Sequence, residues 1–234
     1  MKKIFLVLAL VLANNIMFSQ KINGAWETKV KNNKGIIIKT IITFVDGFYV
    51  ITNFTETNGE FINTSGGSWI VQNNQLKSLI EFDYVHPKNV GTTYSMKITI
   101  NENILKLNDI EYTRIDNGTP GKLNGAWLMS GRKRNGEIQS RDTSRPRKTM
   151  KILSGSRFQW IAYNTETKQF MGTGGGTYST VNGKYTENIE FFSKDKTRVG
   201  MSLVFNYELV DGNWHHSGKS SKGAPIYEIW SIRK

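Results

Sequence analysis

The side chains best suited to chemistry lie in the C-terminal half of the chain. Glu187 and His216 supply a carboxylate and an imidazole, groups that exchange protons or hydrogen-bond a polar ligand. Three aromatic residues, Tyr185, Tyr207 and Trp214, occur in the same stretches of sequence and would form apolar walls around them. What these residues do depends on the fold that positions them.

Motifs favour binding over catalysis. The sequence has no Gly-x-Ser-x-Gly, His-Glu-x-x-His, Walker or dinucleotide-binding motif. Glycoside hydrolysis would need a second inward carboxylate, but Glu190 lies three positions from Glu187 and faces the other side of a strand. We assign no catalytic residue, although a small hydrolase or isomerase using Glu187 and His216 as an acid/base pair is an alternative.

Metals and cofactors are not indicated. The chain has no cysteine, which excludes disulfides, thiol catalysis and Cys-ligated metals. His215 and His216 are adjacent on a predicted strand, so they face opposite ways and cannot grip one ion together. We therefore predict neither a metal site nor a cofactor.

The chain contains an internal repeat. Residues 22–26 (Ile-Asn-Gly-Ala-Trp) recur 101 residues later as 123–127 (Leu-Asn-Gly-Ala-Trp), and ten residues between 61 and 91 recur at a constant spacing of 109. The second copy has thus gained eight residues between these landmarks. We therefore predict a signal peptide at residues 1–20, a first copy at 21–116, a turn-rich linker at 117–121 and a second copy at 122–234.

Each copy has the pattern of an antiparallel β-sheet. Apolar and β-branched residues alternate with a period of two, as in residues 36–44 and 94–100. Five dipeptides that favour two-residue hairpin turns lie between such runs: Asp46-Gly47, Asn58-Gly59, Asn135-Gly136, Asn182-Gly183 and Asp211-Gly212. We expect about eight strands in each copy, closed into an up-and-down barrel, with a sandwich as the alternative.

Both copies begin with Gly-x-Trp and end near an arginine, Arg114 or Arg233. This pattern resembles that of the lipocalin-like (calycin) proteins, and the chain is similar to tandem secreted bacterial members without an assigned function. The resemblance implies an all-β fold of two tandem lipocalin-like antiparallel barrels after a signal peptide. It also implies that Trp26 with Arg114, and Trp127 with Arg233, close the barrel ends through cation–π contacts.

Residues related by the repeat should face the same way, which makes the two interiors comparable. At equivalent positions the first copy has small or aliphatic side chains where the second gains Tyr185, Glu187, Tyr207, Trp214 and His216. We therefore expect a first barrel filled by its own side chains and a second with a small ligand pocket lined by these five residues. The alternative is a satisfied core network without a ligand.

The positive charge is concentrated in the second copy. Residues 117–234 contain nineteen basic and nine acidic residues, whereas residues 21–116 contain ten of each. The basic residues cluster in 132–157, which contains the eight added residues. This segment is either a solvated loop or a site for an anionic surface or polysaccharide, with Arg132, Arg134, Arg141, Arg145 and Arg147 as the candidate contacts.

The N-terminus predicts export. Lys2 and Lys3 precede an apolar run, residues 4–13, of the length found in secretory signal peptides and too short to span a bilayer. No later segment is long and apolar enough to do so. We expect a secreted or periplasmic protein that binds a small polar or amphipathic ligand, with no nucleic-acid partner because the basic segment lacks interleaved aromatic residues.

Overall fold

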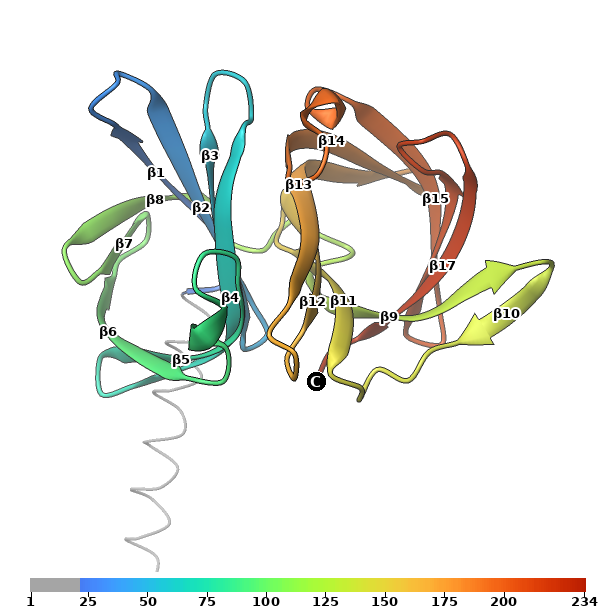
Figure 1. Cartoon of the computed structure of the whole chain (residues 1–234), viewed down its shortest axis with the longest axis horizontal. Coiled ribbons are helices and arrows are strands. Elements are labelled where there is room, and N and C mark those ends of the chain that lie inside the picture. The colour runs from blue at the N-terminus through green and yellow to red at the C-terminus, as the bar shows by residue number, and fades with distance from the viewer. Residues whose placement is uncertain (1–21) are drawn as a thin grey trace, which may run out of the picture.

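Two antiparallel β-barrels lie side by side in the chain (Figure 1). The computed structural model describes residues 22–234. The first barrel runs in chain order and closes where its last strand pairs with its first. Its strands are β1 (Gly24–Lys31), β2 (Ile37–Val45), β3 (Phe48–Thr55), β4 (Phe61–Gln72), β5 (Gln75–Asp83), β6 (Thr93–Ile100), β7 (Ile104–Leu107) and β8 (Ile110–Asp116).

The second barrel closes in the same way, by pairing of β9 with β17. One additional strand, β10, pairs with β9 and extends with it beyond the barrel as a hairpin (Figure 1). The strands are β9 (Gly125–Arg134), β10 (Glu137–Ser140), β11 (Arg147–Leu153), β12 (Arg157–Asn164), β13 (Phe170–Val181), β14 (Lys184–Phe192), β15 (Ser202–Val210), β16 (Asn213–Lys219) and β17 (Pro225–Ile232).

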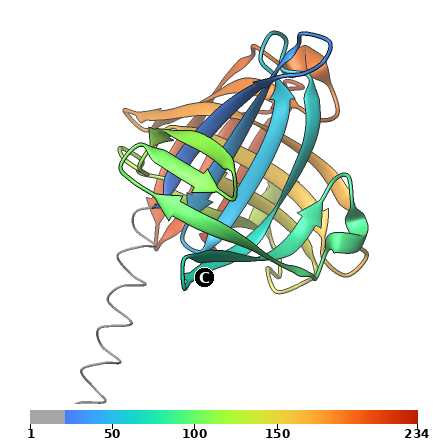
Figure 2. The ribbon, with the colours of Figure 1, turned by 90° about the vertical axis from the view of Figure 1, so that its left-hand side faces the viewer.

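The prediction of an all-β chain with two tandem antiparallel barrels is confirmed. Four of the five predicted turn dipeptides form two-residue connections between consecutive strands, and Asn182 and Gly183 show the positive φ angles, 49° and 72°, that such a turn requires. The prediction is wrong for Asn58-Gly59, which lies in the five-residue connection between β3 and β4. Seen from the side of the first barrel, the strands run obliquely, as closure of a barrel demands (Figure 2). The predicted signal peptide lies outside the described residues.

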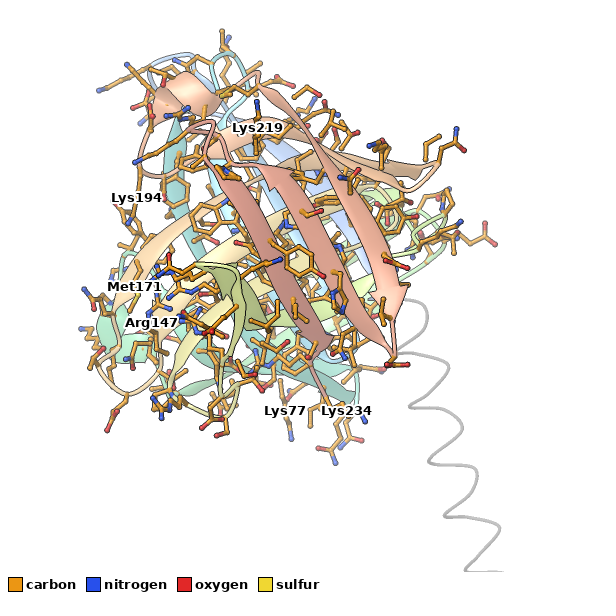
Figure 3. The ribbon with its side chains drawn as sticks, turned by 90° about the vertical axis from the view of Figure 1, so that its right-hand side faces the viewer. Lys77, Arg147, Met171, Lys194, Lys219 and Lys234 are labelled. Carbon is orange, nitrogen blue, oxygen red and sulfur yellow. The ribbon has the colours of Figure 1, made fainter. Side chains whose placement is uncertain are left out.

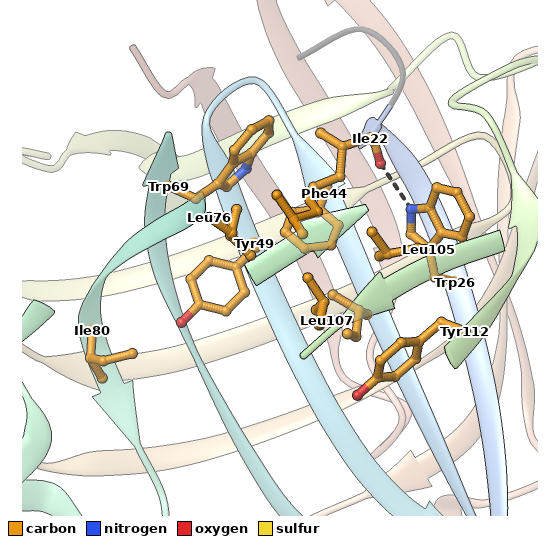
Figure 4. Packing of buried hydrophobic residues seen from close by; sticks show 12 residues of the cluster. Ile22, Trp26, Phe44, Tyr49, Trp69, Leu76, Ile80, Leu105, Leu107 and Tyr112 are labelled. Atoms are coloured by element: carbon orange, nitrogen blue, oxygen red, sulfur yellow. Dashed lines mark hydrogen bonds between the residues drawn. The ribbon is translucent and has the colours of Figure 1, made fainter. Parts of the chain in front are cut away.

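The predicted barrel plug is confirmed in the first barrel. Trp26 is fully buried, and its indole donates a 2.8 Å hydrogen bond to the carbonyl oxygen of Ile22 (Figure 4). The Arg114 guanidinium carbon lies 3.9 Å from the centre of the Trp26 ring. A cation over an indole at this distance contributes about 0.5–2 kcal/mol.

The predicted pairing of Trp127 with Arg233 is wrong. Trp127 repeats the indole hydrogen bond, to the carbonyl of Leu123 at 2.9 Å, but its neighbour on the last strand is Ile232. Arg233 lies one position further along and stacks on Phe48 of the first barrel, 4.1 Å from the ring centre. The arginine that was expected to plug one barrel therefore joins the two barrels.

The barrels meet through an interface with approximate two-fold symmetry. Phe61 and Phe170 are repeat equivalents, and their parallel rings lie 6.3 Å apart. Two further aromatic contacts are related by the same symmetry. Replacing both residues of one contact by their repeat equivalents, 109 positions away, gives the other contact. The two contacts are Phe54 with Phe191 at 4.9 Å and Phe82 with Tyr163 at 4.8 Å.

Buried polar groups at this interface are hydrogen-bonded. The Gln159 amide donates to the hydroxyls of Thr64 and Thr173, which are themselves repeat equivalents, and accepts from Thr52 at 2.7 Å. Arg233 donates to Glu81 at 2.7 Å, and so does the Tyr163 hydroxyl. Apart from the Gln159–Thr173 bond within the second barrel, these bonds join the two barrels, so the interface fixes their relative position.

Candidate functional site

The interior of the second barrel contains the predicted acid and imidazole. Alternation along β14 turns Tyr185 and Glu187 inward, and β16 does the same for Trp214 and His216. Glu187 is 5% exposed and His216 is 2% exposed, which confirms the predicted inward orientation of both. Their role as ligand-binding residues stays a prediction.

Glu187 forms a buried ion pair with Lys151. The Lys151 ammonium lies 2.7 Å from Oε1 of Glu187, which also accepts a hydrogen bond from the Tyr185 hydroxyl at 2.9 Å. The aliphatic stem of Lys151 enters from β11, and its ammonium lies within 4.9–5.2 Å of the ring centres of Tyr185, Trp214 and Trp230. Charge pairing and aromatic faces together offset the loss of hydration.

Lys151 belongs to the basic segment 132–157, which was predicted to be either a solvated loop or a site for an anionic surface, and both predictions are wrong for this residue. Its side chain is 6% exposed and lies inside the barrel. The repeat indicates that position 151 faces inward, because Lys151 lies 109 residues after Ile42, a buried member of the alternating run in the first copy. Arg157, from the same basic segment, is also buried and forms a two-pronged ion pair with Glu190 at 2.7 and 2.8 Å.

His216 is paired with a carboxylate that sequence reasoning missed. Its Nδ1 lies 3.2 Å from Oε2 of Glu228, the residue opposite it on β17. Burial, reinforced by the charge of Lys151, lowers the pKa of His216, so the ring is neutral at pH 7. Because a carboxylate faces Nδ1, we assign the proton to that atom, which leaves a lone pair on Nε2.

Nε2 of His216 is buried without a hydrogen-bond partner among residues 22–234. Glu228 is engaged elsewhere, since it also accepts from the Trp230 indole at 3.2 Å. Burial alone would raise the pKa of Glu228, but the hydrogen bond from His216 and the charge of Lys151 outweigh it and lower that pKa. The site thus presents one free acceptor, Nε2, beside an ionised carboxylate.

These groups line a pocket of about 230 Å³ at one end of the barrel. Its polar lining includes Lys151, Glu187, His216 and Glu228. Its apolar walls are Met129, Trp160, Ile189, Phe192, Leu203, Phe205, Ile226 and Trp230. Of the predicted ligand-binding residues, Glu187 and His216 line this pocket, whereas Tyr185, Tyr207 and Trp214 pack in the adjoining core.

Glycines on β13 shape one wall of the pocket. A Cβ atom at Gly174 would lie 2.7 Å from both the Trp160 indole nitrogen and the Phe192 ring. The absence of a side chain allows these two rings to approach the strand and each other, with centres 5.5 Å apart. Glycine at position 174 therefore allows close packing of this wall.

The expectation that the first barrel is filled by its own side chains is wrong. It contains a larger hollow, of about 380 Å³, whose lining is mostly apolar. The reason is volume: positions that hold Tyr185, Phe205 and Trp214 in the second barrel hold Leu76, Met96 and Leu105 in the first. Smaller side chains on the same barrel frame leave more space.

The basic segment builds a groove beside the pocket of the second barrel. Arg132, Arg141 and Arg147 line a hollow of about 390 Å³ together with Met129, Gln139, Ser140 and Thr149. Figure 3 shows Arg147 beside the β9–β10 hairpin. The other two predicted contacts lie off this groove: Arg134 faces Glu137 at the hairpin tip, and Arg145 pairs with Asp142 at 3.6 Å.

The matched sequence family corresponds to the barrel that contains this site. Residues 122–232 match the profile of a domain of unknown function, DUF4488. The matched range runs from just before β9 to the end of β17. No curated protein matches the chain. Within residues 22–234, no helix is sufficiently long and apolar to cross a membrane.

Proposed function

We propose that the protein binds a small amphipathic ligand in the pocket of the second barrel and does not transform it. The observation that carries the proposal is the buried, unpartnered Nε2 of His216, a residue that lines a mostly apolar hollow. A buried polar atom without a partner costs about 1–3 kcal/mol. A ligand hydroxyl or amine that donates to Nε2 would recover that cost while its apolar body contacts the aromatic walls.

The competing interpretation is a solid structural module with a basic loop. The Lys151–Glu187–Tyr185 group supports it, because each of these three side chains has a partner within the core. Nε2 of His216 and the indole nitrogen of Trp214 depart from that pattern, and a purely structural core gains nothing from leaving such atoms without partners. We therefore favour binding, with the Lys151–Glu187 pair as the support of the pocket floor.

A second candidate function is acid/base catalysis. A neutral imidazole with one nitrogen held by a carboxylate and the other free is the arrangement of a general base. In that case Glu228 is the partner of His216, because Glu187 is engaged with Lys151. Hydrolysis of 4-nitrophenyl acetate, lost with His216→Gln and retained with His86→Gln, would support this candidate; equal background rates in all three proteins would reject it for ester hydrolysis.

We further propose export, on the basic and apolar pattern of residues 2–13. Mature protein recovered from outside the cytoplasm, with an N-terminus near residue 21, would support this proposal. An intact N-terminus on cytoplasmic protein would overturn it. An exported protein encounters small ligands rather than nucleic acid, and this agrees with the proposed small-ligand pocket in the second barrel.

The binding proposal is tested with 2-phenylethanol, which has an aromatic body and one hydroxyl. Intrinsic tryptophan fluorescence and the melting temperature Tm report binding, since Trp160 and Trp230 line the pocket. Leu203→Trp fills the pocket, whereas Val204→Trp adds the same side chain at the neighbouring position on the outer face, where Val204 is 56% exposed. We expect saturable binding by the unaltered protein and by Val204→Trp, and none by Leu203→Trp. Equal responses of both variants would overturn the site.

A further inference from the structure

Three arginines converge on one groove without an acidic partner. Nη1 of Arg141 lies 3.3 Å from the Thr149 hydroxyl, and Nη1 of Arg147 lies 3.4 Å from the same oxygen. Arg132 lines the groove from β9. Among residues 22–234, none of the three forms a salt bridge.

This clustering is electrostatically unfavourable in the absence of an anion. Burial, followed by the charges of Arg147 and Arg132, lowers the pKa of Arg141. Guanidinium groups remain protonated even so, because their pKa lies far above neutral pH. Their forked donors match the oxygens of carboxylate, sulfate or phosphate, and such an anion would relieve the mutual repulsion.

The groove adjoins the pocket of the second barrel. Met129 and Thr149 line both hollows, so the arginine groove and the pocket border each other. Alternation along β11 places Arg147, Thr149 and Lys151 on one face of the strand, in order from the outside to the interior. A single small ligand can therefore reach both hollows.

Charge sets the orientation of such a ligand. Inside the pocket, Lys151 is balanced by Glu187, while Glu228 adds a further negative charge beside the neutral His216. An anionic group would be repelled from that end. At the other end the three arginines attract it, and the apolar walls between them favour a hydrophobic body.

We infer that the groove of Arg132, Arg141 and Arg147 binds the oxyanion end of the ligand whose apolar body occupies the second-barrel pocket. This inference rests on the proposed function and specifies its ligand class: a small amphipathic anion with a hydrogen-bond donor on its apolar part. The oxyanion is a carboxylate or a phosphate or sulfate ester, since the guanidinium geometry suits all three.

The test compares probes that differ at one end. 4-Hydroxyphenylacetate and 4-hydroxyphenyl phosphate carry an anion at one end of the aromatic body and a hydroxyl donor at the other. 2-Phenylethanol is the neutral counterpart with a donor and no anion, and acetate and inorganic phosphate are the anions alone. Affinities are measured by tryptophan fluorescence and calorimetry at constant ionic strength. Arg141→Gln and Arg147→Gln each remove one groove charge, and Arg134→Gln removes an equal charge from the β9–β10 hairpin, off the groove.

We expect at least one anionic aromatic probe to bind about tenfold or more tightly than 2-phenylethanol, as one charge-assisted hydrogen bond would give. The gain should disappear in Arg141→Gln and Arg147→Gln and persist in Arg134→Gln. Preference for 4-hydroxyphenylacetate or for 4-hydroxyphenyl phosphate identifies the oxyanion. A gain that also weakens with ionic strength agrees with an exposed charge contact.

The outcomes separate the two proposals. Binding of 2-phenylethanol with no gain for either anionic probe overturns the groove and leaves the pocket standing. Binding of acetate or phosphate that depends on Arg141, with no further gain from the aromatic body, supports an anion site and overturns the shared ligand. If Arg134→Gln weakens binding as much as Arg147→Gln, the attraction is a diffuse property of the basic surface and the groove is rejected.

Discussion

Lys151 and Glu187 face each other across the interior of the second barrel, with 2.7 Å between Nζ and Oε1 and only 6% of each side chain exposed. The pair lines the pocket but has little access to bulk water. Their attraction therefore offsets a large desolvation cost, and each charge depends on the other.

Glu187→Ala should destabilise the fold severely. It leaves the Lys151 ammonium uncompensated among aromatic rings, which costs about 3–5 kcal/mol. The double variant Lys151→Met/Glu187→Leu should recover most of this loss, because it removes both charges and keeps the volume. Urea unfolding measures both effects, with Glu111→Ala as the control, since Glu111 is 63% exposed in its pair with Lys106 and should lose at most about 1 kcal/mol. A mild effect of Glu187→Ala would contradict the buried pair.

His216 should make stability depend on pH in the mildly acidic range. Its folded-state pKa lies below the ordinary value of 6.5, so the unfolded chain binds the proton more readily. The contribution of His216 to the free energy of unfolding should be fully present above pH 6.5, and it should be lost as the pH decreases toward the folded-state pKa. His216→Gln should flatten this dependence, whereas the exposed-site variant His86→Gln should retain it. Urea titrations between about pH 7.5 and pH 5 test the prediction.

Asp116 should contribute stability in a separate, more acidic range. Burial would raise its pKa, but hydrogen bonds from Ser156, Gly118, Gly155 and Ser154 outweigh burial and lower it. The stabilisation is fully present above the unfolded pKa of about 3.9 and is lost as the pH falls through the folded value. Asp116→Asn should lower stability at pH 6 by about 1–3 kcal/mol and reduce the loss below pH 4. Parallel pH profiles for variant and unaltered protein would count against this role.

The barrel interface should depend on Arg233. Arg233→Met keeps much of the side-chain volume over Phe48 but removes the hydrogen bonds to Glu81 and Tyr163, which we expect to cost about 1.5–3 kcal/mol. Lys234→Met, an exposed neighbour, is the control and should be nearly neutral. A double-mutant cycle with Glu81→Leu should show coupling between the barrels; strict additivity would contradict the contact.

Exchanging equivalent residues should change stability in opposite directions. Met96→Phe places the larger side chain of its equivalent, Phe205, against the hollow of the first barrel and should stabilise by about 0.5–2 kcal/mol. The reverse change, Phe205→Met, removes packed volume from the second core and should destabilise. Thermal unfolding measures both. Destabilisation by Met96→Phe would show that the hollow of the first barrel cannot accommodate a phenylalanine side chain at this position.

The architecture was predictable from the sequence because it depends on local rules. A period of two and turn dipeptides such as Asn182-Gly183 act within a few residues, and the repeat indicated that two equal units form. The inward orientation of Glu187 followed from the same alternation. None of this required knowledge of which side chains meet across the barrel.

The remainder of the site depended on features that sequence spacing obscures. The β16–β17 hairpin is longer than its counterpart, so the repeat spacing changes from 109 to 118, and Glu228 and Ile232 replace Ile110 and Arg114. Lys151 was missed because charge counting treats every lysine as exposed. The hollow of the first barrel was missed because the comparison of the two interiors considered which polar groups the second had gained and not how much side-chain volume the first lacked.

Gln159 shows what joining two barrels in one chain permits. Its single amide serves Thr64 and Thr173, and its repeat equivalent is the apolar Val50. If two identical chains associated through this surface, a glutamine would have to occur twice at the centre, and two amides would compete for the same hydroxyls. Because the two barrels belong to one chain, the two sides of the interface need not have the same sequence. One side can therefore have a glutamine where the other has a valine.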